Sequence, residues 1–405
     1  MTTFEIIAVL LTLTAVGSYL NYKFVKFPPT VGLMAFAFAI SLLAMALNKM
    51  GYFDLRGYIR FIESIDLSNT LLHGMLSFLL FAGALQINLE ELKSIKWEVA
   101  ILAVLGVVIA TFLTGSLIWL AAPLVSLNFS YLYALLFGAL ISPTDPIAVL
   151  SILKQSDLPR KLYVKIGAES LFNDGIGVVA FITILHLADG TESIHPGMIG
   201  ALLIQEALGG ALLGIFLGWL TFLLLRSIDA YTVEILLTLS LVSGGYVLAE
   251  SLDCSAPICM VVAGLVIGNQ NRHYGMSPKT KSHLDEFWDL LDEILNSVLF
   301  IMIGLEILIV SLSSRHIMLG VLAIFAVLLG RLFSVAIPGA LLGFNGKMVG
   351  LLTWGGLRGG LSIAMALSLP AGAEKSIILS ITYIVVLFSI LVQGLTFKSS
   401  LKYFT

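Results

Sequence analysis

Apolar stretches long enough to cross a lipid bilayer recur along the whole of this 405-residue chain. A helix needs about 20 such residues to span the hydrocarbon core of a membrane. The composition agrees, because 59% of the residues are hydrophobic and only 12% are charged, about half the charged share of a soluble domain. The sequence therefore predicts an all-α polytopic membrane protein and excludes a soluble globular enzyme. The net charge of −3 gives no sign of a nucleic-acid partner.

The hydrophobic pattern predicts thirteen spans. Their bounds are 5–22, 29–48, 68–87, 96–122, 130–153, 162–187, 197–225, 231–250, 255–269, 289–311, 316–343, 347–369 and 376–397. The connections after odd-numbered spans, together with the C-terminus, hold 12 of the 22 Lys and Arg residues, and the N-terminus and the other connections hold five. Because basic residues favour the cytoplasmic side, we expect the N-terminus outside and the C-terminus in the cytoplasm.

Two of the predicted spans are interrupted by residues that break helices. Residues 142–146 are Ser-Pro-Thr-Asp-Pro, and the two prolines remove amide donors and obstruct the helix. Asp145 followed by Pro146 is also a favourable start for a new helix. Residues 354–360 are Trp-Gly-Gly-Leu-Arg-Gly-Gly, and four glycines weaken the helix around Arg358.

Such interruptions are typical of a transporter. Non-helical backbone at membrane depth is tolerated only where protein or a water-filled cavity satisfies it, and paired interrupted helices in the two halves of a chain mark a transport site. The two interruptions lie about seven spans apart, and an odd offset gives the two segments opposite orientations. The pattern therefore predicts inverted repeats with two broken helices.

A polar stretch, residues 169–174 (Glu-Ser-Leu-Phe-Asn-Asp), lies inside one of the most apolar spans. On a helix Ser170 and Asp174 share a face, and Glu169 and Asn173 form the neighbouring pair. A carboxylate at this depth is costly unless it is paired, hydrated or protonated, and burial favours the neutral form. A protonated acid is neutral, and so is an acid that holds one monovalent cation. Competition between a proton and a cation for one acid is the chemical basis of exchange.

Residues beside this stretch add oxygen atoms and charges. Thr144 and Asp145, at the first interruption, supply the hydroxyl and carboxylate ligands that hard cations prefer. Structural alternatives stay open, because Asp174 could bond to a neighbouring helix, Asp145 could be a helix cap and Thr144 a local turn donor. A buried charge needs a partner, so we expect Glu169 to pair with Arg358.

Another buried arginine, Arg331, lies inside the span 316–343. We expect Arg331 to approach Asn173 and Asp174 and to tune their charge.

Three ordered segments make the chain resemble a known family. They are SPTDP, AESLFNDGIGVV and WGGLRGGLSIAMALSLP. These segments resemble the signatures of the NhaP-type sodium/proton antiporters of the monovalent cation:proton antiporter-1 group, and the resemblance covers nearly the whole chain. It implies secondary active exchange of Na⁺ (or Li⁺ or K⁺) for H⁺ by alternating access, with no enzyme activity and no cofactor.

The resemblance also implies an NhaA-like fold with two crossed, broken helices, assembled as a homodimer. The transport core would comprise helices at about 96–187 and 316–397, and the dimerisation helices would lie at about 1–87 and 197–311. The protein would reside among the lipids of a prokaryotic plasma (inner) membrane, where an elevator-like movement of the core alternates access.

Site roles follow from the resemblance by motif position. Asp174 is similar to the family's essential ion-binding aspartate, with Asn173 and Ser170 beside it. Thr144 and Asp145 match the threonine and aspartate at the helix crossing. Na⁺ is then expected at Asp174, Ser170 and Thr144.

The charged residues also have counterparts. Glu169 and Arg358 match a family ion pair, and Arg331 matches an arginine that contacts the asparagine–aspartate pair. One departure concerns the span 68–87, where some relatives add a carboxylate. No acid lies in that span of this sequence, and Gln86 is the nearest candidate.

Several functional alternatives stay open. Because Asn173 cannot titrate, protonation of Asp174 alone predicts electroneutral 1:1 exchange. Selectivity among Na⁺, Li⁺ and K⁺ depends on cavity size and oxygen count, so a potassium/proton antiporter is an alternative. A cation channel is a further alternative. An intramembrane aspartyl protease using Asp145 and Asp174 is disfavoured, because its Gly-x-Gly-Asp signature is missing.

Overall fold

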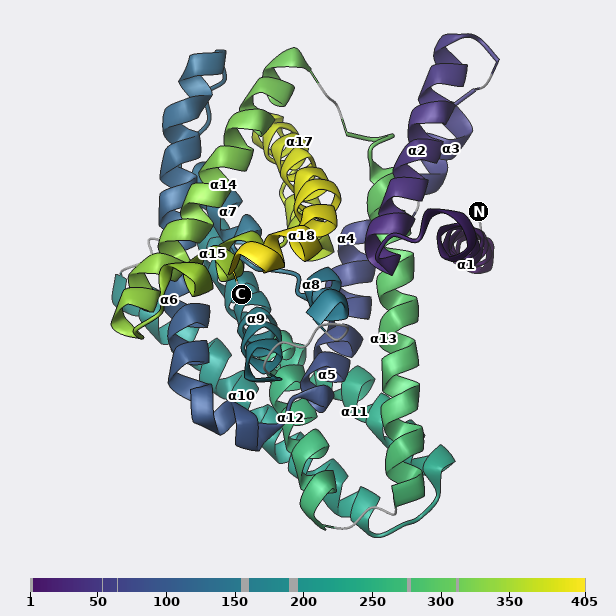
Figure 1. Ribbon diagram of the computed structural model, residues 1–405, viewed down its shortest axis with the longest axis vertical. Coiled ribbons are helices and arrows are strands. Elements are labelled where there is room, and N and C mark those ends of the chain that lie inside the picture. The colour runs from purple at the N-terminus through teal and green to yellow at the C-terminus, as the bar shows by residue number, and fades with distance from the viewer. Residues whose placement is uncertain are drawn as a thin grey trace. The chain divides into compact units, whose positions relative to one another are not determined.

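The computed structural model describes residues 3–52, 54–63, 65–153, 160–188, 196–274, 278–310 and 313–404. Within these ranges every regular element is a helix, and no strand occurs (Figure 1). The α-helices are α1 (Thr3–Leu20), α2 (Pro29–Lys49), α3 (Arg56–Glu63), α4 (Leu67–Asn69), α5 (Leu76–Gln86), α6 (Leu89–Ala121), α7 (Tyr131–Ile141), α8 (Ile147–Leu153), α9 (Arg160–Ala188), α10 (Pro196–Arg226), α11 (Tyr231–Ser251), α12 (Ala256–Tyr274), α13 (Pro278–Glu306), α14 (Ser314–Leu341), α15 (Gly346–Trp354), α16 (Gly360–Ser368), α17 (Ala373–Phe388) and α18 (Gly394–Phe404).

Four short helical segments of other types extend these helices. The π-helices are η1 (Asn21–Val25), η2 (Thr70–Met75) and η4 (Ser389–Gln393), and η3 (Ala122–Val125) is a 3₁₀-helix. For example, α17, η4 and α18 follow one another without a break and together contain the candidate span Ala373–Tyr403.

Nine segments in the described part of the chain are long and apolar enough to cross a membrane. They are Phe4–Val25, Pro29–Lys49, Leu67–Gln86, Leu89–Val125, Arg160–Ala188, Gln205–Arg226, Tyr231–Ser251, Ser314–Leu341 and Ala373–Tyr403. Each matches one of the predicted spans. The chain is therefore an all-helical polytopic membrane protein, as the sequence predicts.

The other four predicted spans are not among these nine segments, and the structure shows why. Spans 130–153 and 347–369 are each divided into two short helices, and the apolar part of α12 is shorter, at Ala256–Asn269. Most of the predicted span 289–311 belongs to α13, which runs without interruption from Pro278 to Glu306 (Figure 1). The first half of α13 carries acidic residues, and residues 278–288, before the predicted span, are part of the same helix.

The chain forms two compact units. The first unit comprises residues 1–72, 109–157 and 296–405, and the second comprises residues 73–108 and 158–295. In the first unit α14 packs along α17, and α16 contacts both α17 and α7. The predicted division into transport core and dimerisation helices is a functional division and stays a prediction.

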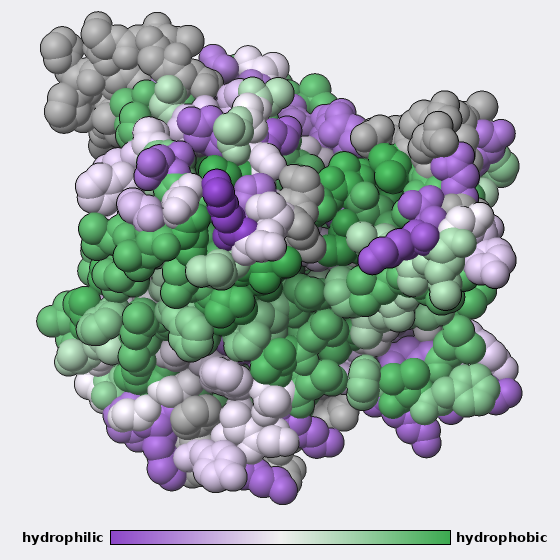
Figure 2. All heavy atoms as spheres, turned by 90° about the horizontal axis from the view of Figure 1, so that it is seen from above, coloured by the Kyte–Doolittle hydropathy of each residue, from purple (hydrophilic) through white to green (hydrophobic). Residues whose placement is uncertain are grey.

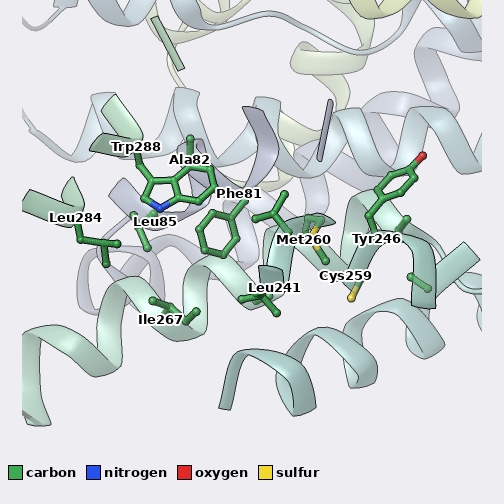
Figure 3. Packing of buried hydrophobic residues seen from close by; sticks show 14 of the residues in the cluster. Phe81, Ala82, Leu85, Leu241, Tyr246, Cys259, Met260, Ile267, Leu284 and Trp288 are labelled. Atoms are coloured by element: carbon green, nitrogen blue, oxygen red, sulfur yellow. The ribbon is translucent and has the colours of Figure 1, made fainter. Parts of the chain in front are cut away.

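The second unit is built around closely packed α5, α10, α11 and α12. Its hydrophobic cluster includes Phe81, Met260 and Trp288 (Figure 3). The Trp288 indole donates a hydrogen bond of 3.1 Å to the Thr238 hydroxyl. Cys259 is fully buried in this cluster and packs there as a small core residue. Because lipid is as apolar as these side chains, van der Waals packing and interhelical hydrogen bonds stabilise such a cluster between membrane helices.

Large apolar side chains also face outward along the long helices. Phe112, Leu212, Phe216 and Phe325 each expose more than half of their surface, and hydrophobic residues cover much of the face in view in Figure 2. In water such a surface would mark a binding interface or an aggregation hazard. On helices of membrane-spanning length, such an apolar surface is compatible with a lipid environment.

Candidate functional site

The interruption between α7 and α8 follows directly from its two prolines. Pro146 has no amide hydrogen, so the carbonyl of Ser142 loses the partner it would have in a continuous helix. The Asp145 carboxylate then caps α8, because its Oδ1 accepts a hydrogen bond of 3.0 Å from the backbone N–H of Ile147. The carbonyl of Pro146 accepts the first helical bond, from Leu150 at 2.7 Å. The predicted cap-and-proline start of a half-helix is confirmed.

The second interruption, residues 355–359 between α15 and α16, meets the first one. The backbone N–H of Asp145 donates a hydrogen bond of 2.8 Å to the carbonyl of Leu357. A side chain at Gly359 would overlap the Asp145 carboxylate. Among the glycines that the structure describes, only Gly51 and Gly343 have a positive φ. Gly359 is therefore needed for close approach and not for an unusual backbone conformation.

Arg358 supplies the donors that the first interruption lacks. Its Nη1 donates to the carbonyls of Ser142 and Pro143, the latter at 2.9 Å. The side chain is only 2% exposed, and buried backbone carbonyls without a partner would be costly. One arginine of the second interrupted helix thus stabilises the end of α7.

Arg331 also lies against the second interruption. It is buried on α14, and its Nε donates a hydrogen bond of 3.2 Å to the carbonyl of Leu352 near the end of α15. A side chain at Gly356 would overlap the Arg331 guanidinium group. Arg331 is therefore packed within the first unit, where Gly356 leaves room for it.

The polar stretch of α9 forms a compact cluster in the second unit. Glu169, Ser170 and Asn173 are almost completely buried, whereas Asp174 is partly exposed. The amide Nδ2 of Asn173 donates a hydrogen bond of 3.1 Å to Oε1 of Glu169. The predicted i,i+4 pairing of these two residues is confirmed. Because its amide end is engaged by Glu169, Asn173 presents its carbonyl oxygen elsewhere.

Two ion pairs tie α9 to α6 in the second unit. Lys165 pairs with Glu98, and Arg160 pairs with Glu91 at 3.1 Å. The Lys165 side chain is 10% exposed, whereas that of Arg160 is 72% exposed. Lys165 lies one helical turn before Glu169, so the inner pair places a buried charge next to the polar cluster. Sequence analysis missed both pairs, because each joins two helices that are far apart in the sequence and nothing local indicates the partner.

The candidate residues divide between the two units. Asp145, Thr144, Arg331 and Arg358 belong to the first unit, with Thr144 fully buried, and the four residues of α9 belong to the second. The proposed Glu169–Arg358 pair, the approach of Arg331 to Asn173 and Asp174, and the shared cation site all join the two units. They stay predictions.

Gln86, the nearest candidate for an extra ligand, has a different contact. Its Nε2 donates a hydrogen bond of 2.7 Å to Oδ1 of Asp289 on α13, in the same unit. This bond joins the end of α5 to the charged half of α13.

Two further polar residues, Ser389 and Gln393, were not singled out by sequence analysis. Both lie on η4 and are almost completely buried. The Ser389 hydroxyl accepts a hydrogen bond of 2.8 Å from the backbone N–H of Arg358 and donates one of 2.7 Å to Gln393. A serine and a glutamine four residues apart in an apolar segment were the only available signal.

The fold and these groups define a class of protein. Two interrupted helices that meet deep in a polytopic helical membrane protein, with buried charges around them, are the architecture of a secondary transporter. Residues 9–403 match the model of the family described as "Sodium/hydrogen exchanger, transmembrane". The chain belongs to this family.

Related proteins share most of the chain. The Na⁺/H⁺ antiporter NhaP of Pseudomonas aeruginosa is 48% identical over 97% of this chain and 95% of its own length. The Na⁺/H⁺ antiporter NhaH of Halobacillus dabanensis is 36% identical over 94% of this chain and 93% of its own length. The solved sodium proton antiporter MjNhaP1 of Methanocaldococcus jannaschii, at pH 8, is 20% identical, covers 100% of both chains and has a TM-score of 0.79. The fold of this chain is therefore similar to that of MjNhaP1.

Proposed function

We propose that this protein is a secondary active antiporter that exchanges Na⁺ for H⁺ across a membrane. The structural observation that carries the proposal is the meeting of the two interrupted helices at Asp145 and Leu357. Membership of the sodium/hydrogen exchanger family and the names of its relatives support it.

Asp174 is the proposed switch between the two substrates. It is the partly exposed member of the α9 cluster, so solvent ions and protons can reach it more easily than its neighbours. With a proton bound the carboxyl group is neutral, and with Na⁺ bound the carboxylate and cation are together neutral. Either state avoids carrying a net charge through the low-dielectric core. An Asp174 carboxylate that holds neither H⁺ nor Na⁺ keeps its negative charge. This charge hinders the movement of the transport core, so the flux of Na⁺ is coupled to the flux of H⁺.

Neighbouring oxygen atoms complete the proposed Na⁺ site. Ser170 contributes its hydroxyl, Asn173 its carbonyl oxygen, and Thr144 and Asp145 contribute oxygen atoms from the first interruption. The bond from Asn173 Nδ2 to Glu169 supports this role, because it directs the donor end of the amide away from a cation. Glu169 in turn is proposed to pair with Arg358 and so to join α9 to the second interruption.

The proposal includes a topology and an assembly. We infer thirteen helical passages, obtained by adding α12, α13 and the two interrupted pairs to the nine apolar segments. The fold is proposed to contain inverted repeats with an NhaA-like crossing. The distribution of Lys and Arg favours an N-terminus outside and a C-terminus in the cytoplasm of a prokaryotic plasma membrane. A core of helices at about 96–187 and 316–397 moves against dimerisation helices at about 1–87 and 197–311. The functional form is a homodimer.

Exchange is proposed to be electroneutral, with one proton moved for each Na⁺. Asn173 cannot titrate, and Asp145 is proposed to serve as the cap of α8 through its Oδ1 and not as a second proton carrier. One titrating acid then moves one proton against one monovalent cation. A second titrating acid would be needed for two protons.

The test uses the purified protein in proteoliposomes that contain a pH-sensitive dye. Addition of NaCl, LiCl, KCl or choline chloride reports which cation drives proton movement. Proton efflux with Na⁺ and none with choline is expected. Proton movement with K⁺ alone would favour the potassium/proton antiporter. Voltage-driven Na⁺ flux without proton counterflow would indicate a channel and overturn the proposal.

A further inference from the structure

A chain of hydrogen bonds spans the interruption between α15 and α16. It begins at the backbone N–H of Arg358, which donates to the Ser389 hydroxyl at 2.8 Å. The Ser389 hydroxyl donates to Oε1 of Gln393 at 2.7 Å, and Nε2 of Gln393 donates to the carbonyl of Trp354 at 3.2 Å. Two side chains of η4 therefore connect the last carbonyl of α15 with the residue before Gly359. We call this chain the polar bridge.

The direction of the polar bridge is consistent at every link. The Arg358 N–H can only donate, and the Trp354 carbonyl can only accept. The hydroxyl of Ser389 uses its oxygen for the first and its hydrogen for the second bond, so Gln393 must turn its carbonyl toward Ser389 and its amide toward Trp354. Hydrogen bonds that run in one direction strengthen each other in a low-dielectric interior.

The polar bridge acts on Asp145 through a single peptide group. The carbonyl of Leu357 and the N–H of Arg358 belong to the same peptide plane. They point in opposite directions because a trans peptide is planar. The carbonyl accepts from the backbone N–H of Asp145 at 2.8 Å, and the N–H donates to Ser389 at 2.8 Å. Rotation of this one plane would therefore disturb the Asp145 backbone and the bond to Ser389 together.

The π-helix η4 provides the geometry for the bridge. The backbone N–H of Gly394 donates to the carbonyl of Ser389, five residues earlier, and this spacing widens the helix locally. Such short π segments occur frequently at functional sites. Ser389 is 1% exposed and Gln393 is 3% exposed, and two polar side chains at this depth are costly unless each hydrogen bond is made.

We propose that Ser389 and Gln393 are positioning residues for cation binding, which act through the Leu357–Arg358 peptide on Asp145. The inference rests on the proposed antiport function. When the bridge is intact, the peptide plane is held from both sides, and the oxygen atoms of Thr144 and Asp145 stay in place between turnovers. When the bridge is broken, the interruption loosens and the cation meets a less well-ordered site.

The experiment compares Ser389→Ala, Gln393→Leu and the double variant in proteoliposomes. Initial rates of Na⁺-driven proton movement give the apparent KM for Na⁺ and the maximal rate. Each single variant should raise the apparent KM about tenfold, which corresponds to ~1.4 kcal/mol and to about one net hydrogen bond. The maximal rate should change less than about twofold. The double variant should have an apparent KM for Na⁺ no higher than that of the more affected single variant, because substitutions within one hydrogen-bond network are not additive.

Controls separate positioning from folding. Thr396→Val is a control outside the bridge. It removes the hydroxyl that accepts a 3.1 Å hydrogen bond from the Trp354 indole, whereas the bridge ends at the Trp354 backbone carbonyl. This variant should leave the apparent KM for Na⁺ unchanged. Ser389→Thr keeps the hydroxyl and should also leave the apparent KM for Na⁺ unchanged. If Gln393→Leu does not fold, Gln393→Asn replaces it in the experiment. Its side chain keeps the amide but is one methylene too short to reach both Ser389 and Trp354, so the same rise in the apparent KM for Na⁺ is expected. Lower melting temperatures with an unchanged KM would overturn the proposal.

A readout without transport distinguishes this inference from the antiport function. Na⁺ that binds the folded state stabilises it by RT ln(1 + [Na⁺]/Kd), so the melting temperature begins to rise only when the Na⁺ concentration approaches Kd. The Na⁺ concentration at which the melting temperature in detergent begins to rise should be higher in Ser389→Ala and Gln393→Leu than in wild type. If wild-type vesicles show no exchange, the proposed function fails, and the stabilisation measurement still tests the bridge. An onset concentration that is equal in wild type and variants would contradict the role of the bridge.

Discussion

The backbone N–H of Asp145 donates a 2.8 Å hydrogen bond to the carbonyl of Leu357 and thereby joins the two interrupted helices of the chain. The two residues are more than 200 positions apart in the sequence. Arg358 strengthens the same junction through the carbonyls of Ser142 and Pro143. Each interruption therefore satisfies backbone groups of the other, which is what makes non-helical backbone tolerable in this environment.

The close approach at this junction predicts the effect of Gly359→Ala. The new methyl group would overlap the Asp145 carboxylate, and overpacking of this kind costs about 1–3 kcal/mol. The variant should melt at lower temperature and exchange Na⁺ more slowly than wild type. Gly346→Ala is the matched control, because Gly346 also begins a helix but has open space around it. Equal behaviour of the two variants would mean that the junction tolerates a side chain.

Two variants of Glu169 separate its two proposed contacts. Glu169→Ala removes both the acceptor of the Asn173 amide and the proposed partner of Arg358. Removing one member of a buried charged pair costs about 3–5 kcal/mol, so the melting temperature in detergent should fall substantially. Glu169→Gln keeps an oxygen for Asn173 but removes the charge, and it should lose most of the same stability. A glutamine variant as stable as wild type would show that the pair with Arg358 does not form.

The ion pair between Lys165 and Glu98 should contribute more than its neighbour on the same two helices. A double-mutant cycle of Glu98→Gln and Lys165→Gln should give a coupling energy of about 1–2 kcal/mol, since Lys165 is largely withdrawn from water. The same cycle for Glu91 and Arg160 should give less than about 1 kcal/mol, because Arg160 is exposed and screened. Thermal melts in detergent measure both cycles. Similar coupling energies for the two pairs would contradict the importance of burial.

Competition at one carboxylate predicts how the apparent affinity for Na⁺ depends on pH. Protons occupy the same acid, so the apparent KM for Na⁺ should rise as the pH falls, by up to about tenfold per pH unit once the acid is mostly protonated. The maximal rate should fall at high pH, where few protons remain to be exchanged. Initial rates in proteoliposomes at several pH values and Na⁺ concentrations measure both trends. An apparent KM that is constant across pH would refute simple competition.

Much of the fold could be predicted from local sequence, because its signals are local. Apolar length predicts membrane helices, two prolines predict the end of α7, and Asp145 before Pro146 predicts the cap of α8 that the structure contains. The pairing of Glu169 with Asn173 likewise follows from helical spacing.

The contacts that could not be predicted are long-range and involve the backbone. Nothing in the sequence indicates that Arg358 donates to the carbonyls of Ser142 and Pro143, because a carbonyl has no residue-specific signature. The contact of Arg331 with the carbonyl of Leu352 was missed for the same reason. Ser389 was overlooked because a single hydroxyl in an apolar helix normally bonds to its own preceding turn.

Asp174 is proposed to be the acid that exchanges a proton for Na⁺. The most direct measurement is the initial rate of Na⁺-driven proton movement in proteoliposomes that contain equal amounts of folded wild type, Asp174→Asn or Asp229→Asn. Asp229 is an exposed acid before α11, and its variant controls for the loss of one carboxylate. Wild type and Asp229→Asn should exchange Na⁺ for H⁺ at similar rates, and Asp174→Asn should show no exchange while keeping its melting temperature. A well-folded Asp174→Asn protein that exchanges at the wild-type rate would contradict the account.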